Sequence, residues 1–184
     1  MLKFNFTNER WHQRNRGAVM VEFAIITPIL ILLVFGITEI GRALYQQNIL
    51  THQVQAAARY MARAQGILDE ACTQQTTWSS AETAAKNIVV FSSQDTGATP
   101  AIPNLETDNV TVTQEVRSIY VADLDETITA CAISVHAEAI FAGIFGAGLT
   151  VPVVPFLGSG TESGWGGFSS LTLNADAQER YIGE

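Results

Sequence analysis

The chain has 184 residues, with 10 Lys and Arg against 18 Asp and Glu, for a formal net charge of −8 at pH 7. This length fits one modest soluble domain and one anchor. Four of the cations precede residue 18, together with a single carboxylate, so the rest of the chain is more acidic than the whole. That balance disfavours a nucleic-acid partner, because phosphate backbones bind clustered Lys and Arg.

Residues 1–17 form a short polar leader with little apolar periodicity. Its cations precede a long apolar run, and the next cation follows that run; the five residues are Lys3, Arg10, Arg14, Arg16 and Arg42. The flank of a membrane span that carries Lys and Arg stays in the cytoplasm. We therefore expect a cytoplasmic N-terminus and a body that crosses the membrane.

Residues 18–38 carry one charge, Glu22, and are long enough to cross a bilayer core as a helix. A charge at the centre of such a helix costs about 2.5–3.5 kcal/mol. Glu22 lies near one end, where interfacial water reduces that cost, but it still needs a partner or a purpose. A cleaved secretory signal does not fit, because no small-x-small cleavage site follows the run. A plain membrane anchor remains the simple alternative.

Residues 18–68 are expected to form one long helix, roughly 75 Å in length, with a kink or loosening at Pro28. After Glu39 the pattern becomes amphipathic, so the first half should face lipid and the second half should pack on a domain. Whether the packed stripe also serves a filament core stays open. Its expected members are Ile40, Leu44, Val54, Ala58, Met61 and Leu68.

Residues 69–184 are expected to form a small extracytoplasmic α+β domain. A polar loop precedes a short helix at residues 80–91, and a Pro- and Gly-containing loop follows that helix. Alternating apolar residues then predict three strands. We expect an antiparallel sheet packed against the long helix, with strands at residues 110–116, 129–141 and 171–175.

The uncharged stretch at residues 139–161 has the length of a second span. Its many glycines and prolines disfavour a continuous helix, so a strand end followed by an apolar loop is expected. An exposed loop of this kind would be a partner surface.

Cys72 and Cys131 both follow the apolar run. In an exported domain, two cysteines predict one disulfide that closes a long loop. Two buried free thiols are the alternative.

The sequence contains no recognisable catalytic or metal-binding pattern. The three histidines, His12, His52 and His136, are far apart and lack metal-ligand spacing. No phosphate-binding loop or nucleophile elbow is present. The acidic group around Asp123 and Asp125 lacks the calcium-loop pattern. We therefore expect no cofactor, no bound metal and no enzymatic activity; the protein is better read as the substrate of an enzyme.

The spacing of Gly17, then Glu22 at the fifth position after it, then an apolar helix, resembles a type IV prepilin. The surrounding segments are more specifically similar to the TadE family, which comprises pilin-like proteins of the tight-adherence (Flp) pilus system. The resemblance covers roughly residues 14–63. It rests on Arg16-Gly17-Ala18-Val19-Met20-Val21-Glu22-Phe23-Ala24, Pro28, Gly36-Ile37-Thr38-Glu39-Ile40-Gly41-Arg42 and Ala56-Ala57-Ala58-Arg59-Tyr60.

The resemblance implies a function and a set of partners. A prepilin peptidase would cleave between Gly17 and Ala18, and Glu22 would pair with the new terminus during subunit assembly. The protein would be a minor pilin or pseudopilin in a bacterial inner membrane. It would interact with other pilin-like subunits and the pilus assembly platform, and whether it then enters the filament stays open. The alternative is an unprocessed single-pass anchor that presents an extracytoplasmic binding domain.

Overall fold

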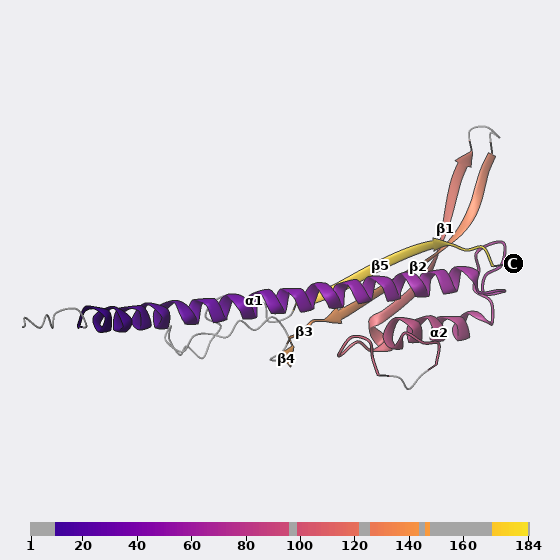
Figure 1. The fold of residues 1–184 in the computed structure, drawn as a ribbon. Helices are drawn as coiled ribbons and strands as arrows, with labels where there is room; N and C mark the ends of the chain where they lie inside the picture. The colour runs from indigo at the N-terminus through magenta and orange to yellow at the C-terminus, as the bar shows by residue number, and fades with distance from the viewer. Residues whose placement is uncertain (1–9, 96–98, 122–125, 144–145, 148–170, 184) are drawn as a thin grey trace, which may run out of the picture.

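The computed structural model describes residues 10–95, 99–121, 126–143, 146–147 and 171–183 (Figure 1). One long helix lies along a small antiparallel sheet, and a second helix packs beside it, so the expected α+β class is confirmed. The elements are α1 (Arg10–Arg63), α2 (Trp78–Phe91), a 3-10 turn (Thr107–Asn109), β1 (Val110–Val121), β2 (Glu126–Ile140), β3 (Ala142–Gly143), β4 (Gly146–Ala147) and β5 (Thr172–Arg180).

α1 is longer at its start and shorter at its end than the sequence predicts. It begins at Arg10, within the expected leader, and continues through Pro28 as one unbroken helix. It ends at Arg63, because Gly66 takes a left-handed conformation with φ +66° and turns the chain back. At 54 residues, α1 is about 80 Å long.

The sheet has the order β1-β2-β5 and is antiparallel throughout. Side chains alternate along β2, so that Ile133, Val135 and Ala137 are buried against α1, whereas His136 and Glu138 lie on the outer face. All three predicted strands are present: β1 and β5 continue five residues past their predicted ends, and β2 begins three residues before its predicted start.

The core forms where α1, α2 and the sheet meet. α1 contributes Leu50, Val54 and Met61, each fully buried at helical spacing, and α2 contributes Val89. Each fully buried aliphatic side chain of this size stabilises the fold by roughly 1.5–3 kcal/mol relative to exposure. This buried stripe holds the domain on the C-terminal half of α1.

The predicted stripe is wrong at its N-terminal end. Ile40 and Leu44 are 54% and 66% exposed, and the face toward the domain instead carries Ala43 and the buried Gln46. The helical phase of Leu50 continues back to residues 46 and 43, which places residues 40 and 44 on another face. Apolarity alone therefore misled the prediction.

The β1–β2 hairpin extends past the end of β5 as a two-stranded arm. β5 pairs with β2 only as far as Arg180, opposite Ala132. Beyond the base of the arm at Cys131, residues 117–121 and 126–130 pair with each other alone and project away from α1 (Figure 1). Two-stranded ribbons are marginally stable by themselves, so this arm depends on its attachment to the body.

The uncharged stretch at residues 139–161 is described only in part. Its beginning completes β2 and forms the short pair β3–β4, whereas residues 148–170 lie outside the described residues. In the part of the chain that the structure describes, α1 is the one helix long and apolar enough to cross a membrane.

Candidate functional site

The N-terminal half of α1 is an apolar rod that no part of the described domain covers. The most apolar 18-residue segment of α1 has a mean hydropathy of 2.6, and none of its residues is buried. Large side chains are exposed all around it, as for Phe23, Ile29 and Ile37. Water is a poor environment for such a surface, and hydrocarbon is a good one. This half of α1 therefore has the properties of a membrane anchor.

Gly17, Ala18 and Glu22 lie together on this rod, and all three are exposed. A side chain at position 17 would contact nothing within 4 Å. Ala18 and Glu22 are four residues apart, so they share one face of α1, separated by one turn and about 6 Å of rise. A positive charge at residue 18 would consequently have the Glu22 carboxylate as a neighbour on the same face.

Three polar side chains of α1 attach the domain to the helix just beyond the rod. Gln46 is 6% exposed, and its Nε2 donates to the Ala142 carbonyl oxygen at 3.2 Å. Arg42 Nη2 reaches the same oxygen at 3.5 Å, and Gln47 Nε2 donates to the Asn174 carbonyl oxygen at 2.7 Å. These bonds hold β3 and the start of β5 on α1. The sequence prediction missed Gln46 because it placed this residue away from the packed stripe, whose weak members were Gln47, Thr51 and Gln65.

Residues 17–59 match the family model described as TadE-like protein. The resemblance expected from the sequence is therefore confirmed over this segment, which runs from Gly17 to the part of α1 that packs in the core. No curated protein and no solved structure matches the chain.

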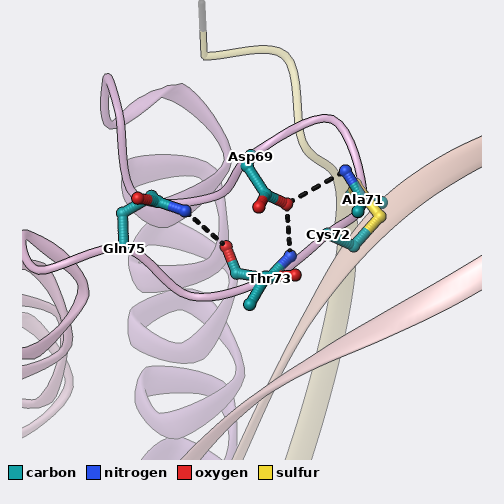
Figure 2. The surroundings of a disulfide bond; sticks show 6 residues. Asp69, Ala71, Cys72, Thr73 and Gln75 are labelled. Carbon is teal, nitrogen blue, oxygen red and sulfur yellow. Dashed lines mark hydrogen bonds between the residues drawn. A yellow bond between two sulfur atoms is a disulfide. The ribbon is translucent and has the colours of Figure 1, made fainter.

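The disulfide between Cys72 and Cys131 lies outside the TadE-like segment. It joins the loop after α1 to β2, with a Cα–Cα distance of 5.4 Å. Figure 2 shows how Asp69 shapes this loop: its Oδ1 accepts hydrogen bonds from the backbone N–H groups of Ala71 and Thr73, at 2.9 and 2.7 Å. Cys131 lies opposite Val116, where the hairpin arm leaves the body. The disulfide thus ties the base of the arm to the end of α1.

The outer face of the sheet carries a histidine between two carboxylates. His136 Nδ1 lies 2.6 Å from Asp176 Oδ1 on β5, and its Nε2 lies 3.3 Å from Glu138 Oε1. The hydrogen bond with Asp176 raises the pKa of His136 above 6.5; burial opposes this, and Glu138 adds to it. Among the described residues, no group of three His, Cys, Asp or Glu side chains has a metal-binding arrangement.

Proposed function

We propose that this chain is a pilin-like minor subunit that takes part in assembly of a tight-adherence (Flp) type IV pilus. The observation that carries the proposal is the match of residues 17–59 to TadE-like proteins, which indicates a pilus-associated role. The match begins at Gly17 and covers the exposed apolar rod of α1. In this proposal the role of the protein is structural rather than enzymatic.

In this proposal the protein is made as a precursor in a bacterial inner membrane. The basic leader, residues 1–17, stays in the cytoplasm, α1 spans the bilayer at about residues 18–38, and residues 69–184 form the extracytoplasmic domain. A prepilin peptidase cleaves between Gly17 and Ala18. The absence of any neighbouring side chain around Gly17 in the described part of the chain supports an accessible cleavage point.

Cleavage leaves an ammonium group at Ala18, which is positively charged at neutral pH. Glu22 lies one turn away on the same face, so the two charges can pair within one subunit, or Glu22 can pair with the terminus of a neighbour. Opposite charges attract more strongly at low dielectric than in water, and an unpaired charge there is costly. Docking against other pilin-like subunits at the assembly platform satisfies both groups.

One observation favours the alternative of an unprocessed anchor that presents an extracytoplasmic binding domain. α1 is helical from Arg10 through Gly17, so the proposed cleavage point lies inside a helix. A peptidase must open this turn before it cuts. Glycine lowers that cost, because it destabilises a helix by about 1 kcal/mol relative to alanine.

The two proposals are separated by the N-terminus of the accumulated protein. In cells with an active prepilin peptidase, we expect N-terminal sequencing to give Ala18, and we expect Gly17→Leu to leave the precursor uncut. Gly36→Leu is the matched control, because position 36 also lies on α1 with no atom within 4 Å of a new Cβ. A wild-type protein that retains Met1 would support the unprocessed anchor instead.

A further inference from the structure

α1 carries an apolar stripe that continues beyond the proposed span. Leu33, Ile37, Ile40 and Leu44 follow one another at steps of four, three and four residues, and all are 53–66% exposed. Tyr45 beside them is 68% exposed. Between residues 46 and 63, all of which the structure describes, α1 has no large apolar side chain that is this open to solvent. The exposed apolar surface therefore ends at Tyr45 rather than at the end of the span.

Between residues 39 and 46, the face of α1 opposite the apolar stripe is buried. Glu39 and Gln46 are 4% and 6% exposed, so the helix presents one face to the domain and the apolar stripe to the outside. A helix designed only to carry a water-soluble domain would place polar residues on the outer face. The exposed apolar side chains at residues 40–45 thus need an apolar or interfacial environment.

The helix rise gives the depth of these residues. When residues 18–38 fill the hydrocarbon core, the Cα atoms of Ile40, Leu44 and Tyr45 lie roughly 3, 9 and 10 Å beyond its edge. The headgroup layer adds about 5–7 Å on each side of the core. Side chains on a helix tilt toward its N-terminus, which here is the membrane end. Leu44 and Tyr45 consequently reach back into the headgroup layer.

The sheet contributes a fourth apolar side chain at this level. Ile140 ends β2 and is 48% exposed. It lies two residues before Ala142, whose carbonyl oxygen accepts hydrogen bonds from Arg42 and Gln46. Figure 1 shows β3 beside the middle of α1, whereas α2 and the C-terminus lie at the far end. The near end of the sheet is therefore level with residues 42–46.

We propose that Ile40, Leu44, Tyr45 and Ile140 form a collar that seats the extracytoplasmic domain in the lipid headgroup layer around α1. The inference rests on the membrane anchor of the proposed function and deepens it. The occupant is lipid, because Ile40 and Leu44 continue the same apolar stripe of α1 that faces the bilayer core. A tyrosine, with an apolar ring and a polar hydroxyl, suits this layer. The exposed Arg42 lies within the collar, where its remaining guanidinium donors can reach phosphate oxygens.

The collar sets the height of the domain before assembly. Contact with the headgroup layer holds the near end of the sheet on the bilayer and keeps α2 and the arm away from it. A subunit that leaves the membrane must withdraw the collar from lipid as well as the span. The collar therefore contacts lipid only while the subunit resides in the membrane.

Site-directed photocross-linking tests this proposal on the full-length protein in phosphatidylcholine proteoliposomes. A benzophenone-bearing phenylalanine is placed singly at position 45, at Ile29 within the span, or at Ile182. Ile182 is the matched control, since it is 63% exposed and its backbone bonds to Ala62, far along α1. We expect lipid adducts at position 45 in a yield approaching that at position 29 and several times that at position 182. Retention of the Cys72–Cys131 disulfide, measured by thiol labelling, shows that each variant is folded.

Each result has a distinct meaning. Lipid adducts at position 29 without adducts at position 45 overturn the collar and leave the anchor intact. Cross-links from position 45 to another copy of the protein, in place of lipid, also overturn it. If position 29 itself gives no lipid adduct, the membrane anchor of the proposed function is wrong, and the collar is rejected with it.

Discussion

Glu22 is the one charged side chain at residues 18–38, and it is exposed on the surface of α1. No described side chain of the domain lies near enough to form an ion pair with it. Folding of the domain therefore gives no reason for a carboxylate at this position, whereas the proposed subunit contact would.

At the residue scale we expect Glu22→Ala and Glu22→Gln to impair pilus assembly while export, cleavage after Gly17 and the disulfide stay intact. Glutamine keeps the shape of the side chain but removes the charge that pairs with the new terminus. The measurement is the amount of pilus at equal protein level, and Glu70→Gln, on an exposed loop of the domain, is the control. Normal assembly by Glu22→Gln would contradict the pairing and is the outcome that a plain anchor predicts.

His136 leads to a prediction about pH. Its pKa in the folded state is raised above 6.5, mainly by Asp176. The protonated form is thus favoured by folding, so its stabilising contribution is full below about pH 6.5 and is lost as the pH rises through the folded-state pKa. Because the His136 side chain is 37% exposed and both carboxylates are more exposed than that, water screens the pair and the contribution should be at most about 1 kcal/mol.

The measurement is the melting temperature of the detergent-solubilised protein at pH 6 and pH 8. We expect His136→Gln to lower the melting temperature more at pH 6 than at pH 8. An equal effect of His136→Gln at both pH values would refute the assignment.

At the scale of single elements, α1 has two different surfaces within a few residues. Leu50 is fully buried in the core, whereas Leu44 is 66% exposed on the proposed collar. The two leucines have the same side chain and lie on the same helix. Their different exposure comes only from the helical phase, which turns Leu50 toward the domain and Leu44 away from it.

This pair offers a matched test of the packing. We expect Leu50→Ala to reduce the free energy of unfolding of the domain by about 2–5 kcal/mol, because it leaves a cavity between α1 and the sheet. Leu44→Ala should change it by no more than about 0.5 kcal/mol. Denaturant unfolding of the solubilised protein measures both. Equal losses would restore the sequence-predicted stripe, in which residue 44 packs on the domain.

At the scale of the whole molecule, the disulfide joins two parts that are distant in the chain. Its cysteines are separated by 59 positions, and it joins the loop after α1 to the point where the hairpin arm begins. Backbone bonds reinforce this junction, since Tyr181 N–H donates to the Cys131 carbonyl oxygen and Ile182 N–H donates to that of Ala62.

We expect the double substitution Cys72→Ser with Cys131→Ser to reduce the free energy of unfolding by up to about 4 kcal/mol, the chain-entropy value for a loop of this length. The arm should lose protection first, because it has no support beyond its base. Hydrogen exchange resolved by peptide measures the arm and the core separately. In the oxidised wild-type protein, alkylation followed by mass spectrometry should label neither cysteine until a reductant is added. Full labelling without a reductant would reject the bond.

The sequence by itself determined the features that depend on local pattern. Continuous apolarity at residues 18–38 predicts the rod, alternation predicts the three strands, and a chain with two cysteines has one possible intramolecular pairing. The TadE-like segment was also readable, because the Gly17–Glu22 spacing and the motifs after it are short and contiguous. Each of these signals is carried by neighbours in the chain, so no knowledge of the fold is required.

Tertiary structure alone decided which face of α1 is covered. Ile40, Leu44 and Gln46 all lie on one helix, and apolarity assigned the first two to the core. Gln46 is buried instead, because its Nε2 reaches the carbonyl oxygen of Ala142 in β3, whereas Ile40 and Leu44 point the other way. Burying a polar group costs free energy unless it is hydrogen-bonded, and the partner of Gln46 Nε2 is 96 residues away, where the local sequence pattern does not show it.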